Sequence, residues 1–318
     1  MSAARRLRRE AASRRLLVLG WHNVGGTYCF PSRPGWGRRG LRQQLEVLRS
    51  AAHVVPLEPA LRRLADGGRL PPRAVALTFD DGYADNLTVA AALLRRMRLP
   101  ATFFLVPDLL GGTGQAWWEV VSWAIATGRA AELLWSGERY ELLDPRSRRR
   151  VAEAVSASLK ELDHEARTAA VEEVVDRTRP AGPRPGRELF LDWEGARSLV
   201  RQGFAVGSHT CRHDILSRES GQGQEDDLRE SRRRLEDELG VPVRLLAYPN
   251  GRREDYDERT VAAAAAAGYS HALTTVDGFA TTRSRPFEVP RSVVYPERSV
   301  LDLALCLRDA VRAGADRG

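Results

Sequence analysis

The chain has 318 residues, enough for one large domain or two ordinary ones, and its 43% of hydrophobic residues is typical of a globular protein with a sizeable core. No apolar run reaches the ~18 residues that a membrane-spanning helix needs, which argues against an integral membrane protein. The formal charge is +7, but arginines are mixed with acidic residues throughout, as in RRRLEDELG (232–240), so nucleic-acid binding is disfavoured.

The basic start of the chain passes directly into the apolar run LLVLGWH (16–22). This run is as long as one strand and lacks a small-residue cleavage site, so residues 1–15 are predicted to form a short arm rather than a signal peptide. Three widely spaced cysteines, Cys29, Cys211 and Cys306, predict no disulfide framework and agree with a reducing compartment. We therefore expect a cytoplasmic protein.

Short apolar runs alternate with helical patterns along most of the chain. Strands are predicted at 16–22, 53–57, 74–81, 101–107, 204–210, 243–249, 271–275 and 287–294. Helices are predicted at 41–52, 86–97, 192–202, 225–239 and 259–267. Buried strands that alternate with helices indicate a parallel sheet, and seven or eight such units favour an α/β fold of the (β/α) barrel type, complete or incomplete.

Residues 113–187 interrupt this alternation. They contain helical patterns without a strong strand and end in the turn-rich stretch RTRPAGPRPGR (177–187). We interpret them as a helical insertion in one βα connection of a discontinuous barrel domain, 16–112 and 188–300, followed by a C-terminal helix at 301–318. Such insertions usually lie at the active-site face. The insertion contains three aromatic residues close together, Trp117, Trp118 and Trp123. They could form a sugar-binding platform or, as we favour, the core of the insertion itself.

Two short motifs carry the candidate chemistry. His209 and His213 follow an apolar strand four residues apart, a spacing that puts both on one face of a helical turn and often marks half of a metal site. Asp80 and Asp81 follow another strand, and in a barrel the carboxyl ends of the strands meet on one face. Either motif alone is more often a turn or a pair of ordinary histidines, but both at strand ends indicate a metal centre. One aspartate would bind the metal, and the other would take a proton from the metal-bound water.

These motifs resemble those of a known family. TFDDGY (78–83) and SHTCRH (208–213) are similar to the first two motifs of the polysaccharide deacetylases, a family of the NodB-homology, carbohydrate esterase type. LLAYPNGR (245–252) resembles the third motif, and the likeness covers roughly residues 16–110 and 188–300.

The resemblance implies a distorted (β/α)7 barrel with a divalent metal, zinc first, with cobalt, iron, manganese or nickel as alternatives. It implies that Asp81, His209 and His213 bind the metal and that Asp80 is the catalytic base. The implied reaction is hydrolysis of an N-acetyl group on an amino sugar, a glycan or a glycosylated metabolite.

The sequence also departs from the family pattern. Ala247 stands where many members have an arginine that braces the base, and Arg291, from the last predicted strand, could replace it. The proton-donating histidine expected near the C-terminus is missing from LDLALCLRDA (301–310). His22 and His271 are the remaining candidates for this role, and His22 is preferred because it follows a strand.

Further residues are predicted to bind substrate. Tyr248 and Pro249 could form a wall of the cleft or be plain turn residues, and Trp117 and Trp118 are the candidates from the insertion. Two other functions stay open: an amidohydrolase or deformylase acting on a non-glycan amide, and a non-catalytic carbohydrate-binding relative. The complete set of ligands and base disfavours the second, because a protein that only binds sugar needs no free base.

Overall fold

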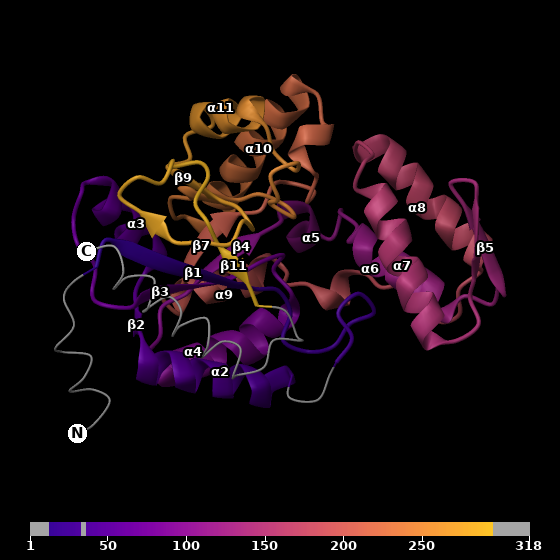
Figure 1. Cartoon of the computed structure of the whole chain (residues 1–318), viewed down its shortest axis with the longest axis horizontal. Coiled ribbons are helices and arrows are strands. Elements are labelled where there is room, and N and C mark those ends of the chain that lie inside the picture. Colours follow the sequence, from indigo (N-terminus) through magenta and orange to yellow (C-terminus); the bar gives the residue numbers. More distant parts are fainter. Residues whose placement is uncertain (1–12, 33–35, 295–318) are drawn as a thin grey trace.

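The computed structural model describes residues 13–32 and 36–294, so the predicted helix at 301–318 and most of the predicted arm lie outside the described residues. A curled, mostly parallel sheet forms the centre of the fold (Figure 1). Six of its strands lie side by side and run in the same direction: β1 (Arg15–Trp21), β3 (Ala74–Phe79), β4 (Thr102–Leu105), β7 (Ala205–Ser208), β8 (Leu245–Ala247) and β9 (His271–Leu273).

The last described segment closes the curled sheet. Its strand β11 (Ser292–Val293) pairs in parallel with β1, and just before it Val289 forms a parallel bridge to Leu273 of β9. Seven parallel strands therefore follow one another around the barrel. This confirms the prediction of a distorted (β/α)7 barrel and places the carboxyl ends of all seven strands on one face. Two short strands extend the sheet: β2 (His53–Val54), beside β3, and β10 (Ala280–Thr281), antiparallel to β1.

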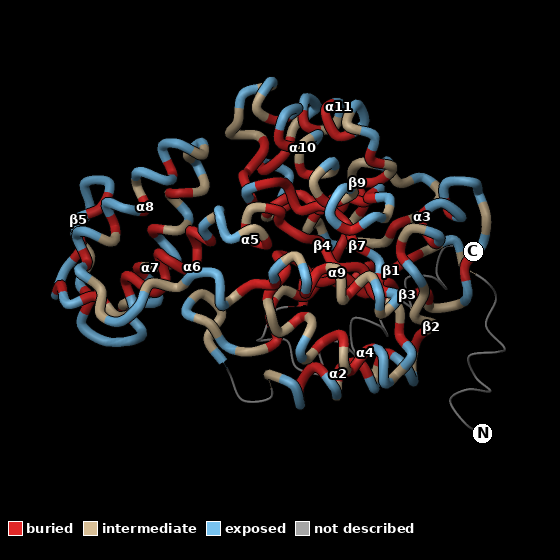
Figure 2. Tube along the Cα trace, turned by 180° about the vertical axis from the view of Figure 1, so that it is seen from behind, coloured by how far each residue is buried: buried red, intermediate tan, exposed pale blue. Residues whose placement is uncertain are grey.

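Alternate side chains of the strands enter two apolar clusters. Leu16 and Val18 lie inside the curled sheet with Phe104, whereas Leu17 and Leu19 face the surrounding helices. Because both faces of the sheet are covered, its strands are apolar runs rather than alternating ones. Figure 2 shows the buried residues concentrated around β1, β3, β4 and β7. The barrel helices are α2 (Gly37–Ala51), α3 (Leu57–Ala65), α4 (Ala92–Met97), α9 (Trp193–Arg201), α10 (Gly221–Leu239) and α11 (Glu258–Ala266).

One predicted helix begins differently from expectation. The helix expected at 86–97 starts as a wider π-helical segment, Asn86–Ala91, and becomes α-helical only in α4. Asn86, the first residue of this segment, is fully buried and donates its side-chain amide to the carbonyl oxygen of His22, at 2.8 Å. Such π segments are frequent near functional sites.

Residues 113–187 form a separate group of helices beside the barrel (Figure 1). After the short helix α5 (Pro107–Gly111), the chain forms α6 (Trp117–Thr127), β5 (Glu132–Trp135), β6 (Glu138–Glu141), α7 (Pro145–Leu159) and α8 (His164–Thr178). The sequence showed no strong strand here, and the hairpin of β5 and β6 was not predicted. A hairpin forms because Ser136 and Gly137 both adopt positive φ angles, 50° and 83°, the turn geometry that suits antiparallel strands.

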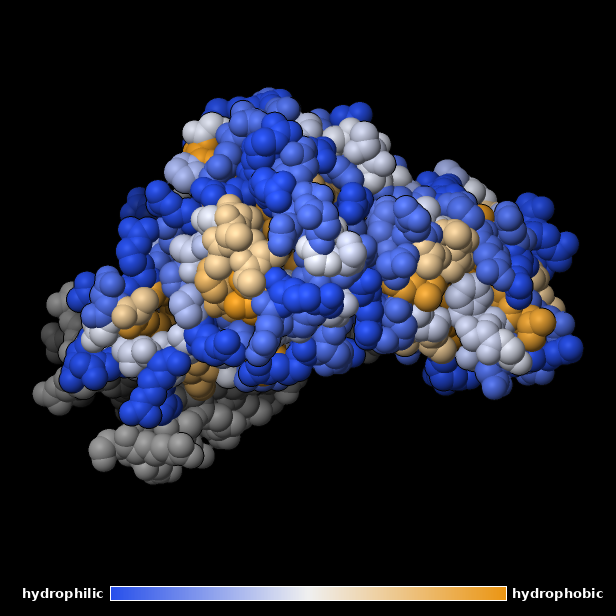
Figure 3. Space-filling view, turned by 90° about the horizontal axis from the view of Figure 1, so that it is seen from above, coloured by the Kyte–Doolittle hydropathy of each residue, from blue (hydrophilic) through white to orange (hydrophobic). Residues whose placement is uncertain are grey.

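The surface seen from above is mostly hydrophilic, with apolar residues in small separate patches (Figure 3). Within the described part of the chain, no helix has the length and apolar character that crossing a membrane requires.

Candidate metal centre

Asp80 and Asp81 lie at the carboxyl end of β3. The backbone N–H of Asp80 still donates to Trp21 on β1, at 2.8 Å, so the sheet holds this residue in place. Asp81 and Gly82 then adopt positive φ angles of 69° and 75°, which turn the chain sharply over the barrel. Both carboxylates are only 2% exposed. Burying two adjacent carboxylates is costly unless each has its own partner.

The two histidines come from the end of β7. His209 continues the sheet, because its N–H donates to Leu105 of β4 at 2.9 Å, and residues 209–214 form a loop. The expected helical turn was wrong. Thr210 and His213 have positive φ angles of 64° and 59°, and this tight loop, rather than a helix face, brings the rings to a centroid distance of 4.8 Å. The Sγ of Cys211, between them, lies 3.6 Å from the carbonyl oxygen of Asp227 on α10.

Asp81 and the two histidines converge on one point. The Nε2 atoms of His209 and His213 lie 3.3 and 3.4 Å from Oδ1 of Asp81. Ligand atoms about 2.1 Å from one tetrahedral cation stand about 3.4 Å apart, so these separations suit a divalent metal. Oδ1 of Asp81 is buried and has no well-formed hydrogen bond to any described residue. Nδ1 of His209 contacts the carbonyl of Ala247 at 2.7 Å, which directs the free lone pair of Nε2 toward Asp81.

Electrostatics favour the charged form of Asp81. Burial raises the pKa of its carboxyl, but the close approach of the His209 and His213 rings outweighs burial and holds this pKa well below its ordinary value. For the two histidines burial has the opposite effect and lowers the pKa, because it disfavours the charged form of the ring. For His209, contact with Asp81 and Asp80 more than compensates, so its pKa is raised, whereas the pKa of His213 stays lowered. The donor set is thus two imidazoles and an ionised carboxylate.

Asp80 has a different partner, Arg291, which lies 211 residues away in sequence. Nη1 of Arg291 donates to Oδ1 of Asp80 at 2.7 Å and to Oγ1 of Thr78 at 3.2 Å, and the arginine is fully buried. Burial raises the pKa of Asp80, but the charge of Arg291 lowers it below its ordinary value. A methyl group on Gly20 would lie 3.3 Å from the Arg291 side chain, so the glycine leaves room for it. Arg291, just before β11, therefore reaches Asp80, whereas Ala247 on β8 has no side chain that could.

The two candidate histidines for proton donation lie at opposite ends of the barrel. His22 follows β1 at the end that carries the metal centre, is partly exposed, and stacks on Phe30 at 5.5 Å. Its charge is among the causes that lower the pKa of Asp80 and Asp81. His271 begins β9 at the other end, and burial lowers its pKa, with smaller effects of opposite sign from Glu58 and Arg62 of α3.

Tyr248 and Pro249 follow β8 and are buried. Tyr248 is 1% exposed, stacks on Tyr256 at 4.7 Å, and donates its hydroxyl to the carbonyl of Phe287 at 3.1 Å. Pro249 is also buried. That these two residues bind substrate stays a prediction, and the ring of Tyr248 is held in the packing of the barrel.

The tryptophans of α6 are buried as well. Trp117, Trp118 and Trp123 are each less than a tenth exposed and belong to the apolar core of the insertion. That Trp117 and Trp118 bind sugar stays a prediction. Trp118 instead packs on the ring of His213 at a centroid distance of 4.3 Å and donates Nε1 to the hydroxyl of Tyr83 at 2.9 Å.

The sequence interpretation missed a buried acid beside the metal centre. Glu119 of α6 is 1% exposed and accepts hydrogen bonds from Thr27 Oγ1 at 2.7 Å, the N–H of Cys29 at 3.2 Å and the Tyr83 hydroxyl at 2.8 Å. Burial raises its pKa. Its position within the apolar stretch WWEVV was a usable signal, since an acid in a buried helix face needs partners.

A second missed carboxylate, Asp85, follows the turn that Asp81 and Gly82 form. Its Oδ2 accepts the backbone N–H groups of Val24 and Gly25, at 2.9 and 2.6 Å. It thereby fixes the loop after β1, which begins with His22.

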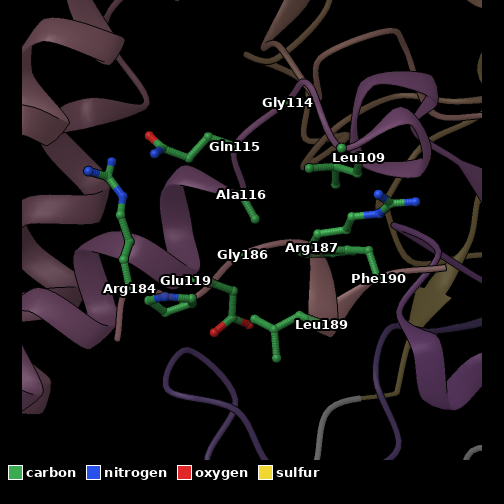
Figure 4. A pocket seen from close by; sticks show the side chains of 12 residues that line it. Leu109, Gly114, Gln115, Ala116, Glu119, Arg184, Gly186, Arg187, Leu189 and Phe190 are labelled. Carbon is green, nitrogen blue, oxygen red and sulfur yellow. The ribbon is translucent and has the colours of Figure 1, made fainter. Parts of the chain in front are cut away.

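A cavity of about 270 Å³ lies between the insertion and the barrel (Figure 4). Figure 4 shows Arg184 and Arg187 on opposite sides of it, with Glu119 between them. Arg184 pairs with Glu172 of α8, at 2.6 Å. Phe190, which also lines the cavity, contacts Tyr83 at a ring centroid distance of 4.8 Å, so this space adjoins the residues that surround the metal centre.

Comparisons with known proteins agree with this geometry. The sequence model of the family described as polysaccharide deacetylase matches residues 67–129 and 144–272. YxkH of Bacillus subtilis (strain 168), which is named as a polysaccharide deacetylase, is 27% identical over 114 residues. That match spans 36% of this chain and 40% of YxkH.

Two solved structures share the fold over almost their whole length. The deacetylase PplD of Streptococcus pyogenes, determined in complex with acetate, has a TM-score of 0.62 and 18% identity over 93% of this chain and 99% of that chain. IcaB from Ammonifex degensii has a TM-score of 0.58 and 20% identity over 93% of this chain and 98% of that chain. Because the family's sequence model matches more than half of the residues, including both aspartates and both histidines, this chain belongs to the polysaccharide deacetylase family.

Proposed function

We propose that this protein is a metal-dependent hydrolase that removes an N-acetyl group from an amino sugar or an N-acetylated glycan. The observation that carries the proposal is that two adjacent buried carboxylates have different partners. Asp81 faces two imidazoles, whereas Asp80 faces only the guanidinium of Arg291. A site that only binds a ligand or a structural metal needs no second, unligated carboxylate.

Asp81, His209 and His213 would hold the metal, and their mixed nitrogen and oxygen donors suit Zn²⁺ first, with Co²⁺, Fe²⁺, Mn²⁺ and Ni²⁺ as alternatives. When bound, such a cation supplies Lewis-acid chemistry: it lowers the pKa of a water molecule and polarises an acyl carbonyl.

Asp80 acts as the base in this proposal. The charge of Arg291 keeps its carboxylate ionised, so Asp80 can take a proton from the attacking water as the new C–O bond forms at the acyl carbon. His22 gives a proton to the sugar nitrogen as the C–N bond breaks, and the products are acetate and a free amine. Arg291 orients Asp80 and limits its movement through its second contact, with Thr78.

The first experiment measures bound metal and released acetate together. Purified protein should contain about one divalent cation per chain and should release acetate faster from N-acetylhexosamine oligomers than from simple acetanilides. Asp80→Asn should keep the metal and lose about 10²–10⁴-fold in kcat, the usual contribution of a general base. Asp81→Asn and His209→Ala should lose both metal and turnover.

Asp226→Asn, an exposed aspartate on α10, is the matched control and should match the unmodified protein in both readouts. Full turnover in Asp80→Asn would contradict the role of the base. Faster hydrolysis of acetanilides would indicate an amidohydrolase of small amides, and sugar binding without acetate release would indicate a non-catalytic relative.

A further inference from the structure

The two metal-binding histidines are supported in different ways. Nδ1 of His209 contacts the carbonyl of Ala247 within the barrel, at 2.7 Å. Nδ1 of His213 is buried and has no hydrogen-bond partner among residues 13–32 and 36–294. Histidine ligands usually need such a contact on the second ring nitrogen to fix the orientation of the ring. Something other than a hydrogen bond must therefore hold His213.

The insertion contacts His213 and its loop at two places. On one side, Trp118 of α6 packs against the imidazole at 4.3 Å, and its Nε1 is fixed by the Tyr83 hydroxyl. The other contact is made to Asp214, the residue after His213, which is fully buried. Nη2 of Arg167 on α8 forms an ion pair with Oδ1 of Asp214, and Arg167 is itself only 2% exposed.

Neighbouring residues reinforce the contact at Asp214. Nδ1 of His164, the first residue of α8, lies 2.9 Å from Oδ1 of Asp214, and the N–H of His164 donates to Glu219 at 2.9 Å. Arg212 donates Nε to Oδ2 of Asp214 at 2.9 Å. The guanidinium of Arg167 also donates to the carbonyl of Leu162, at 3.1 Å. The carboxylate is thus held by cations from both the insertion and its own loop.

The energetics indicate a positioning role for this ion pair. A buried pair gains little stability over an apolar replacement, because desolvation offsets the attraction. Removing one partner, however, leaves an uncompensated buried charge and forces the segment to rearrange. The segment in question is the loop in which His213 holds a φ of 59°, a conformation that a non-glycine residue keeps only when its surroundings enforce it.

We infer that the insertion is part of the metal centre: Trp118 against the ring of His213 and Arg167 on Asp214 position this ligand, in place of the hydrogen bond that the barrel gives to His209. This inference rests on the metal centre proposed above. It assigns Arg167 and Trp118 as positioning residues that touch neither the metal nor the substrate.

The test measures metal affinity rather than turnover. Metal-stripped full-length protein is titrated with Co²⁺, and the visible absorption of the bound ion reports both affinity and ligand geometry. Arg167→Met should weaken Co²⁺ binding about 10–100-fold, as loss of the residues that orient metal ligands usually does, and should alter the spectrum. Arg167→Lys should restore binding to within a few-fold. Arg177→Met, an exposed arginine of the same helix that pairs with Glu173, is the matched control.

A double variant distinguishes a specific effect on metal binding from a general loss of folding. Arg167→Met with Asp214→Asn removes both charges of the fully buried pair and leaves only the partly exposed Arg212 and His164 beside the amide. It should therefore fold, as circular dichroism can check, and should still bind Co²⁺ more weakly than the unmodified protein. Unchanged affinity and spectrum in the folded double variant, or in Arg167→Met, would overturn the inference. If the unmodified protein itself binds no metal, the proposed function fails instead, and the two failures are thereby distinguished.

Discussion

At the scale of single residues, Asp80 and Asp81 show how neighbouring carboxylates acquire different chemistry. Both are buried, and burial alone would raise both pKa values. Asp81 is compensated by two imidazoles and Asp80 by one guanidinium, so only Asp81 offers an oxygen to a shared metal position. The partner, more than the aspartate itself, decides the role of each residue.

Arg291 should therefore control the acidic side of the pH profile. Its charge lowers the pKa of Asp80, so in Arg291→Ala burial dominates and that pKa rises. Because protonated Asp80 cannot act as a base, the acidic limb of kcat/KM should move to higher pH, with bound metal unchanged. Leaving Asp80 buried and unpaired should also cost about 3–5 kcal/mol in free energy of unfolding. The pH profile of acetate release checks this, with the exposed Arg253→Ala as control. An unshifted limb would refute it.

The two candidate proton donors can be separated by one comparison. His22→Gln should lower kcat about 100-fold, within the usual range for a general acid, while bound metal stays the same. His271→Gln serves as the control, since this residue lies at the opposite end of the barrel, and its kcat should change less than twofold. Initial rates of acetate release and metal content per chain are measured for both. Equal rates for the two variants would remove His22 from the mechanism.

At the scale of elements, the strand ends were predictable but the loops that follow them were not. Apolar runs located β1, β3 and β7, and the direction of parallel strands then brought Asp81 and His209 to one face. The conformation of residues 209–214 could not be predicted, because its left-handed positions, Thr210 and His213, carry no glycine. The pairing of Asp80 with Arg291 was proposed only from a strand end, since contacts so distant in sequence leave no local pattern.

At Gly82, the backbone geometry of the turn requires the glycine that the sequence has. It has a φ of 75°, and an added Cβ would lie 3.1 Å from Leu105. Gly82→Ala should lower the free energy of unfolding by about 1–2 kcal/mol for the left-handed conformation, and by more for the contact. Gly203→Ala has the same strain, at a φ of 83°, with open space around it, and is the matched control.

Urea unfolding of the two glycine variants separates the effects. Gly82→Ala should be less stable than Gly203→Ala and should also bind Co²⁺ more weakly, because the turn after Asp81 shifts. Equal stability of the two variants would show that the Leu105 side chain can move away from the added methyl group without lowering the free energy of unfolding.

At the scale of the whole molecule, the insertion and the barrel meet beside the metal centre. The sequence located the insertion within 113–187, yet its contacts could not be predicted, because Arg167 and Asp214 are 47 residues apart and lie in two different packing units. The tryptophans of the insertion belong to its core, which was the favoured one of the two interpretations, since an apolar helix such as α6 must bury its tryptophans somewhere.

His164 should make this junction depend on pH. The hydrogen bond that His164 donates to Asp214 raises the pKa of His164 above the ordinary value of 6.5, against the opposing effect of burial and of the nearby charges of Arg212 and Arg167. A raised pKa in the folded state means that this contact stabilises the protein fully below about pH 6.5, the unfolded value, and loses its effect as the pH rises through the folded-state pKa. His164→Gln should therefore lower Tm more at pH 6 than at pH 9. Thermal unfolding of metal-stripped protein at both pH values measures this, and an equal Tm difference at both would show that the charge of His164 contributes nothing to holding the insertion on the barrel.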